Sequence, residues 1–377
     1  MSSGNSLKRI TAVLFLAAFI AGSACGKQSQ ASGEGGGGKP EPVKMSIRYI
    51  SSNTFEIRVP QPPGNEVLVH RFVRQYYSNT LAYGESQHKT LVCADVWYPN
   101  SIYFDGEPEC IQGNLNFIYL VNDKVAGFEN EGCHVGAGHG CEIKNSQLFY
   151  ADGEAFDPST NFGEIECEEF RVVLDANCYA VDVTQEGHKS GRALLKLDSS
   201  GNPILTAQHS YDALYKPDNT IEWDNSLTIH RNGLQFKQAH GGMLQGKAKS
   251  FNMITIGDEN QSTNKFVYNA DHNCTITPIG NCPKFDVNRF HTASWVKMFG
   301  KGITVTQTME QPAPRSAENY LMFIFYSGAS SDDSSLDRCK VYMQPMRGVD
   351  HFSTANAEIF DKGDILRAHL KRTIELN

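Results

Sequence analysis

Short segments in which apolar and polar residues alternate recur along this chain of 377 residues. In one of them Ile303, Val305 and Met309 share a face on which Gln307 is the single polar residue. The opposite face consists of threonines: Thr304, Thr306 and Thr308. A period of two residues is that of a β-strand with one buried face, and long helical periodicity is scarce. The pattern predicts an all-β fold, an antiparallel sandwich or jelly roll.

The clearest turn signal is the pair Asn232-Gly233, which two-residue type I′ turns prefer. With that turn, four apolar residues on either side of it would share one face: Leu227, Ile229, Leu234 and Phe236. We therefore predict a β-hairpin over residues 227–237, in which Ile229 faces Phe236.

Other alternating or strand-sized apolar segments are also predicted strands: residues 45–49, 55–59, 117–121 and 320–326. The C-terminal residues 366–376 alternate too, although a short helix capped by Asp364 would explain them almost as well. Residues 184–203 are polar and rich in turn formers. They predict two β domains, 45–185 and 186–377, with one large sandwich as the alternative.

The N-terminal segment is built like an export signal. Lys8 and Arg9 precede an apolar run over residues 10–20, and small residues follow it up to Ala24. The run is too short to cross a hydrocarbon core of about 30 Å comfortably, which favours a cleaved signal peptide, residues 1–24.

The residues Gly22-Ser23-Ala24-Cys25 resemble the lipobox of bacterial lipoproteins. The resemblance implies that Cys25 is acylated, as with palmitate, and becomes the first residue of the mature chain. Gly22 departs from the aliphatic residue usual in that family. Ordinary cleavage after Ala24, with Cys25 as a plain thiol, is therefore the alternative. Gly26 rather than Asp follows the cysteine, and by the same resemblance we expect an outer-membrane lipoprotein facing either the periplasm or the exterior.

Residues 25–44 are expected to form a flexible tether. They contain a run of glycines within positions 32–38, then Pro40 and Pro42, a composition that buries no core. Loss of residues 1–24 removes two of the 34 basic residues and none of the 42 acidic ones, which leaves 32 and a net charge of −10. This balance argues against nucleic acid as a partner.

Nine cysteines remain after Cys25, and in an exported chain cysteines are expected to form disulfides. Sequence does not fix their pairing, but eight of them fall into close neighbours: Cys133 with Cys141, Cys167 with Cys178, Cys274 with Cys282, and Cys93 with Cys110. An odd number leaves at least one free thiol, for which Cys339 is the candidate.

The segment from Cys133 to Cys141 also holds His134 and His139 among glycines. Two cysteines and two histidines within nine residues are metal ligands in kind, but their spacing matches no common zinc site. We prefer a disulfide that closes a glycine-rich loop, and we keep a metal site at His134 and His139 as the alternative.

Three glutamates, Glu164, Glu166 and Glu168, would share one face of a strand. Paired carboxylates are what glycoside hydrolysis needs, and the string resembles the catalytic strand of the laminarinase-like jelly-roll glycosidases. The resemblance implies Glu164 as nucleophile, Glu166 as its helper and Glu168 or Glu169 as acid/base. The preferred interpretation is plain alternation, with Ile165 and Cys167 inward and the glutamates in water.

Five aromatic residues could stack on sugar rings if exposed, but core positions suit most of them better: Trp97, Tyr98, Tyr103, Trp223 and Trp295. Phosphate-loop, zinc-protease, nucleophile-elbow and Cys-x-x-Cys motifs are absent from the sequence. We therefore expect a binding or structural protein of the cell envelope without a cofactor, whose partners are the membrane through its lipid and either carbohydrate or another envelope protein. A laminarinase-like enzyme that uses Glu164 and Glu168 is the alternative.

Overall fold

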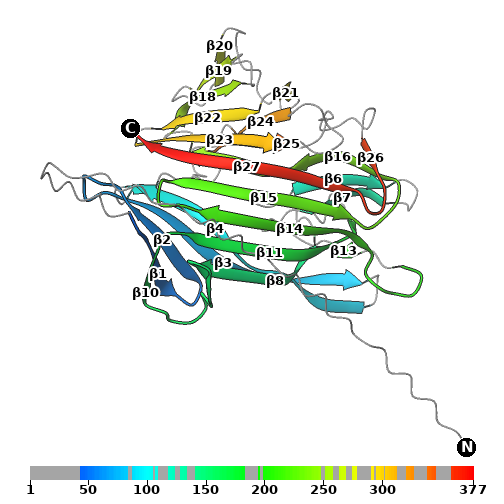
Figure 1. Ribbon diagram of the computed structural model, residues 1–377. Helices are drawn as coiled ribbons and strands as arrows, with labels where there is room; N and C mark the ends of the chain where they lie inside the picture. Colours follow the sequence, from blue (N-terminus) through cyan, green and yellow to red (C-terminus); the bar gives the residue numbers. More distant parts are fainter. Residues whose placement is uncertain are drawn as a thin grey trace, which may run out of the picture. The chain divides into compact units, whose positions relative to one another are not determined.

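The structure, a computed structural model, describes most of the chain beyond residue 42. The described residues are 43–83, 87–104, 107–108, 118–123, 128–133, 141–182, 194–195, 198–247, 251–257, 263–268, 274–277, 290–292, 294–300, 302–311, 320–326, 338–344 and 358–377. Over these ranges the secondary structure is strands without a helix, and every strand pair is antiparallel (Figure 1). In particular, no described helix is long and apolar enough to cross a membrane.

The largest sheet has eleven strands. In spatial order they are β20 (Cys274–Thr277), β19 (Thr263–Tyr268), β18 (Phe251–Gly257), β22 (Trp295–Gly300), β23 (Ile303–Gln311), β27 (Ile365–Leu376), β15 (Thr220–Ile229), β14 (Leu205–Tyr215), β11 (Phe170–Tyr179), β8 (Cys141–Ala151) and β9 (Glu154–Phe156).

A second sheet has six strands. Their order is β10 (Glu164–Cys167), β1 (Met45–Ser51), β2 (Thr54–Pro60), β3 (Val67–Tyr83), β4 (Gln87–Phe104) and β5 (Glu107–Pro108). Two four-stranded sheets follow. In the first, the spatial order is β26 (Glu358–Phe360), β16 (Leu234–His240), β6 (Ile118–Asp123) and β7 (Phe128–Cys133). In the second, it is β17 (Gly242–Lys247), β25 (Arg338–Gln344), β24 (Tyr320–Tyr326) and β21 (Phe290–Thr292). A two-stranded sheet pairs β12 (Val181–Asp182) with β13 (Leu194–Leu195).

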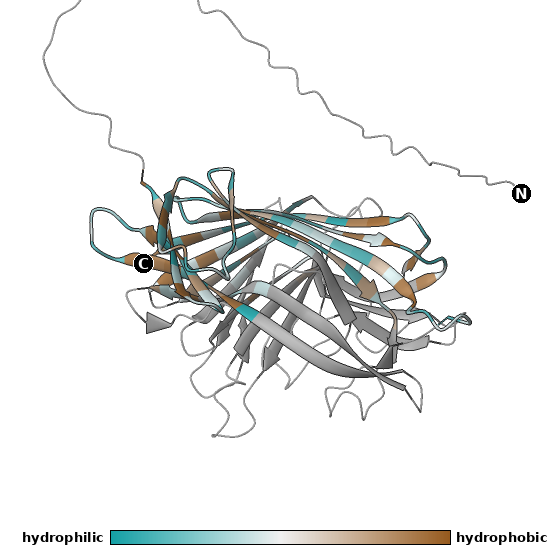
Figure 2. Cartoon of the chain, turned by 90° about the horizontal axis from the view of Figure 1, so that it is seen from below, coloured by the Kyte–Doolittle hydropathy of each residue, from teal (hydrophilic) through white to brown (hydrophobic). Residues whose placement is uncertain are grey.

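The two largest sheets pack face to face through aromatic side chains. Phe55 on β2 stacks on Phe72 of β3 with ring centroids 4.7 Å apart, and Trp97 on β4 lies 5.3 Å from Phe55. Across the interface, Phe149 on β8 lies 5.8 Å from Phe55, and Tyr215 on β14 lies 5.7 Å from Phe72. Hydrophobic and hydrophilic residues alternate along the strands as this packing requires (Figure 2). The all-β sandwich prediction is confirmed.

Several strand predictions are confirmed in detail. β1 and β2 pair as neighbours. In β23, Ile303, Val305, Gln307 and Met309 are all buried. The C-terminal segment is the twelve-residue strand β27, paired on both edges, so the helix alternative was wrong. Asp364 accepts a hydrogen bond from the Asp361 backbone N–H in the turn before this strand.

The predicted hairpin over 227–237 does not form. β15 ends at Ile229 and β16 begins at Leu234, but β15 pairs with β14 and β27, whereas β16 pairs with β6 and β26. Both edges of β15 are therefore already occupied. Gly233 has a positive φ of 70° while Asn232 does not, although a type I′ turn needs both. Instead the Asn232 side chain accepts a hydrogen bond from the backbone N–H of Lys362, so the segment links two sheets.

The predicted boundary between residues 185 and 186 is also wrong. β11 and β14 lie on opposite sides of it and pair along most of their length, from Phe170 opposite Tyr215 to Tyr179 opposite Leu205. Strands from both predicted domains thus share the eleven-stranded sheet, which belongs to one compact unit.

Candidate functional site

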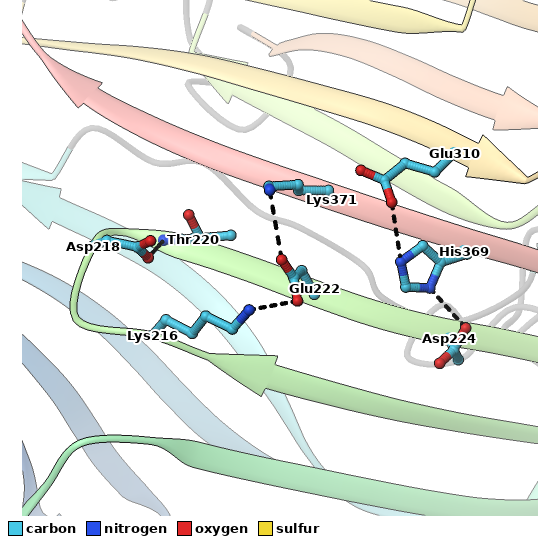
Figure 3. Close-up of polar contacts among 8 residues, drawn as sticks. All are labelled: Lys216, Asp218, Thr220, Glu222, Asp224, Glu310, His369 and Lys371. Carbon is cyan, nitrogen blue, oxygen red and sulfur yellow. Dashed lines mark hydrogen bonds and ion pairs between the residues drawn. The ribbon is translucent and has the colours of Figure 1, made fainter. Parts of the chain in front are cut away.

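The face of the eleven-stranded sheet that points away from the core carries charged side chains on neighbouring strands. On β15, Trp223 and Asn225 are buried, so Glu222 and Asp224 point to the other face. We call the outward-facing set the charged band, most of which appears in Figure 3: Arg171, Asp212, Lys216, Glu222, Asp224, Glu310, His369 and Lys371.

The first row of the band has a carboxylate between two lysines. Lys216 Nζ lies 2.6 Å from Glu222 Oε2, and Lys371 Nζ lies 3.5 Å from Glu222 Oε1 (Figure 3). The hydrogen bond from Lys216 is the main cause that holds the pKa of Glu222 below its ordinary value. The row therefore carries one net positive charge.

The second row has a histidine between two carboxylates. His369 Nδ1 lies 2.8 Å from Asp224 Oδ1, and His369 Nε2 lies 3.3 Å from Glu310 Oε2 (Figure 3). A neutral imidazole has one N–H and can donate to only one of them, whereas an imidazolium donates to both. Residues from β15, β23 and β27 meet here.

Two carboxylates of the band face each other. Asp212 on β14 is the direct cross-strand neighbour of Asp224 on β15. Each has its own basic partner, because Arg171 forms an ion pair with Asp212 and His369 contacts Asp224. Like charges directly opposite each other destabilise a sheet. Arg171 offsets this repulsion, and His369 does so when its imidazole is protonated.

Lys216 of the charged band, in the turn after β14, also lines an open pocket of about 710 Å³. The pocket is lined by Asp152, Glu168, Glu169, Lys216, Pro217 and Asp218. Asp152 Oδ1 accepts hydrogen bonds from the backbone N–H groups of Glu168 and Glu169 at 2.8 and 2.9 Å. Asp218 Oδ1 accepts one from the backbone N–H of Thr220 at 3.0 Å (Figure 3). The carboxylates make this pocket acidic.

The structure separates the three predicted catalytic glutamates. β10 ends at Cys167, so Glu164 and Glu166 lie exposed on an edge strand, opposite Arg48 and Ser46 of β1. Glu168 lies beyond the strand end, in the bend that Asp152 binds. The prediction that all three share a strand face was wrong for Glu168, because the chain turns there toward β11. Plain alternation is confirmed for Glu164, Glu166 and the buried Cys167.

The cysteine predictions are tested at one pair. Cys167 is a free buried thiol, so the predicted pair with Cys178 does not form, and burial raises the pKa of Cys167 to about 12. For five other cysteines the structure describes only the backbone: Cys93 on β4, Cys133 ending β7, Cys141 beginning β8, Cys274 beginning β20 and Cys339 on β25. Cys25, Cys110 and Cys282 lie outside the described residues. The predicted pairing of these cysteines therefore stays a prediction.

The alternative metal site at His134 and His139 also lies outside the described residues. Where the structure does describe side chains, no group of three or more His, Cys, Asp or Glu residues is arranged to hold a metal ion.

The aromatic residues are mostly core, as predicted. Trp97 and Trp223 are 5% and 1% exposed. Trp295 is partly buried, and its indole lies against Gly257, where an added Cβ would come within 2.2 Å of Trp295 Cζ2. Tyr103 is partly exposed and lies under the guanidinium of Arg71, 4.4 Å from its ring centroid. For Tyr98 on β4 the structure describes the backbone and not the side chain.

Sequence reasoning did not find the charged band. Its signal was present in the alternation of residues 366–376, which places His369 and Lys371 together on the polar face. The partners of these residues lie far away in the sequence: His369 and Asp224 are 145 positions apart. Alternation selects a face, but it does not select the neighbouring strand.

No protein-family model and no curated protein matches the sequence. Among solved structures, the chain is similar to the GH36 α-galactosidase AgaB from Geobacillus stearothermophilus, with 9% identity, a TM-score of 0.41, and coverage of 87% of this chain and 41% of the other. It is also similar to galactose 1-epimerase from Lactobacillus acidophilus, with 8% identity, a TM-score of 0.36, and coverage of 89% and 99%. An α-galactosidase from Lactobacillus brevis is 7% identical with a TM-score of 0.36, and the match covers 88% of this chain and 39% of the other. The chain thus spans about two fifths of the length of the two galactosidases. Likeness of this degree carries no inference about activity.

Proposed function

We propose that this chain is a lipid-anchored protein of a bacterial cell envelope, whose β body serves in binding or structure at the outer membrane. The observation that carries the proposal is the N-terminal order of features: a basic pair, an apolar run, Cys25 and a glycine-rich segment. The compact unit begins at Pro42, directly after these features, which suits a tether that leads to a separate folded body.

The charged band is the surface that we assign to binding. Its side chains are partly or largely exposed, from 29% for Glu222 to 76% for Asp224. Exposed ion pairs contribute only about 0–1 kcal/mol to stability, so the fold does not depend on this arrangement. Fixed rows of opposite charge instead offer directional contacts to a polar or charged partner.

Membrane fractionation with radiolabelled palmitate tests the anchor. Wild type should incorporate label and sediment with outer membranes, whereas Cys25→Ser should lose both. Ser23→Ala is the matched control, because it changes a neighbouring residue and keeps the thiol. Label that persists in Cys25→Ser would exclude lipidation at this cysteine.

Pull-down from solubilised envelopes tests the binding face. Charge reversal at two exposed positions, Asp224→Lys and Glu310→Lys, should abolish capture of a partner. The same reversal at Glu164 and Glu166, exposed on the edge strand β10, should leave capture intact. Equal capture by both variants would remove the band from the proposal.

A further inference from the structure

The segment between β15 and β16 contains the only Asn-Gly pair in the sequence, Asn232-Gly233. In such a pair the backbone nitrogen of the glycine can attack the side-chain carbonyl carbon of the asparagine, because glycine has no Cβ that hinders the approach. The attacking atom is Gly233 N and the attacked atom is Asn232 Cγ. They are separated only by the Cβ, Cα and carbonyl carbon of Asn232, so the bond between them closes a five-membered ring.

The structure holds the attacking nitrogen against a carboxylate. The backbone N–H of Gly233 donates to Asp361 Oδ1 at 2.8 Å. This contact continues the register of β16 and β26, in which Leu234 lies opposite Phe360 and both residues are buried. Asp361 is itself held in a turn, because its backbone N–H donates to Asp364 Oδ2 at 2.7 Å. A general base must lie about 2.6–3.2 Å from the atom whose proton it takes, and Asp361 meets this requirement.

The next residue of the same turn holds the attacked carbonyl group. Asn232 Oδ1 accepts a hydrogen bond from the backbone N–H of Lys362 at 3.0 Å. Negative charge develops on this oxygen as the nitrogen adds to Cγ, and a donor about 2.7–3.1 Å away stabilises that charge as in an oxyanion hole. The nucleophile and the electrophile therefore both lie against one dipeptide, Asp361-Lys362.

Water, the second reactant, can reach this place. Asn232, Asp361 and Lys362 are all exposed. Gly233 has a φ of 70°, and a Cβ built on it would meet no atom within 4 Å. The reacting groups thus lie at the surface, on the link that joins the eleven-stranded sheet to the sheet of β16.

We propose that Asn232 is a site of self-catalysed deamidation in the folded protein. Gly233 N forms a bond to Asn232 Cγ while the Asp361 carboxylate takes the proton of the nitrogen. The bond from Cγ to the side-chain nitrogen then breaks, the proton passes to that nitrogen, and ammonia leaves. The remaining cyclic imide is opened by water at either of its carbonyl groups. Position 232 is thereby converted to aspartate or isoaspartate.

The product alters the link between the two sheets. It places a further carboxylate beside Asp361 and Asp364, and isoaspartate also lengthens the backbone between β15 and β16. Each folded molecule therefore changes the charge and the length of this link with time. The inference rests on the turn geometry and does not depend on the proposed function at the membrane.

Peptide mapping by mass spectrometry, after incubation of the full chain at neutral pH, measures the conversion of Asn232. The same chain incubated in urea gives the rate without Asp361 and Lys362 in place. A fixed backbone ordinarily slows this reaction, but here the folded chain should react at least about tenfold faster than the unfolded chain, because base and donor are in position. A folded chain that reacts no faster than the unfolded one would overturn the proposal.

Asp361→Asn separates the base from the rest of the turn. Its side-chain oxygen can still accept from Gly233 N–H but does not take the proton, so the folded variant should react about tenfold more slowly than wild type. In urea the two rates should be equal. Asp218→Asn is the matched control, because Asp218 also accepts a backbone N–H in an exposed turn, that of Thr220, and it should react as wild type does. A wild-type rate in folded Asp361→Asn contradicts the role of Asp361. If this variant does not fold, the comparison of folded and unfolded wild type decides.

Discussion

Arg372 donates two hydrogen bonds to one oxygen atom of Gln307 inside the sandwich, at 3.1 and 2.6 Å. The two residues face each other across β27 and β23, and both are buried. This contact explains the one polar residue on the inward face of β23. It also makes the pair a sensitive point for stability.

Gln307→Leu should lower the free energy of unfolding by about 3 kcal/mol, because a buried guanidinium loses the acceptor of two charge-assisted hydrogen bonds. Urea unfolding measures the change. Gln208→Leu, on the partly exposed face of β14, should change it by less than about 0.5 kcal/mol. The double variant Gln307→Leu/Arg372→Met should regain most of the loss, since an apolar pair replaces both partners. An unaltered stability in Gln307→Leu would contradict this account.

His70 should make the fold sensitive to acid. Burial, with a smaller contribution from the Arg372 charge, lowers the pKa of His70 from 6.5 to about 3 in the folded state. Between these values the unfolded chain binds a proton that the folded chain does not. The stability that the fold has with a neutral His70 is thus fully present above pH 6.5. The free energy of unfolding then decreases as the pH falls toward 3, by at most about 1.4 kcal/mol per pH unit.

Urea unfolding of wild type and His70→Asn between pH 7 and pH 4 measures this effect. The free energy of unfolding of the wild type should fall more steeply with decreasing pH than that of the variant. The difference in slope should correspond to about one proton bound by the unfolded chain alone. Parallel pH profiles would show that His70 is protonated in the folded state.

Gly257→Ala should displace the indole of Trp295, because the new Cβ would come within 2.2 Å of Cζ2. Overpacking of this kind costs about 1–3 kcal/mol, and the tryptophan fluorescence should shift to longer wavelength as the ring moves toward solvent. Adding Trp295→Leu removes the clash and should restore most of the stability. A fluorescence spectrum unchanged in Gly257→Ala would show that β18 and β22 accommodate the methyl group.

His369→Ala should lower stability by less than about 1 kcal/mol, since exposed ion pairs contribute little. The loss comes from Asp224, which then faces Asp212 without its basic partner. With His369 protonated, the effect should shrink between about 0.05 and 1 M salt, where the screening length shortens. Arg367→Ala, exposed on the same strand, is the control. A loss of several kcal/mol would mean that the second row supports the fold rather than a binding surface.

The strands that sequence predicts best are those with one clearly buried face. β23 and β27 alternate except at Gln307 and Arg372, and the structure buries the expected apolar residues, including Leu366 and Leu370. A period of two residues is a local property, so it is visible without knowing the neighbours.

The pairing of strands is not local, and there the predictions failed. The sequence Asn232-Gly233 favours a tight turn, but it does not show that β27 and β14 already occupy both edges of β15. The same limit hid the contacts of His369 with Asp224 and of Arg372 with Gln307. In each, two residues from distant segments meet only after the sheet has formed.

Mass spectrometry of the mature N-terminus tests the central claim most directly. The chain is purified from the envelope of a bacterial host, and its first peptide is sequenced and weighed. A lipid-anchored protein predicts a chain that begins at Cys25, with acyl groups on the cysteine. A chain that begins at Cys25 without added mass, or one that retains residues 1–24, would contradict the anchor.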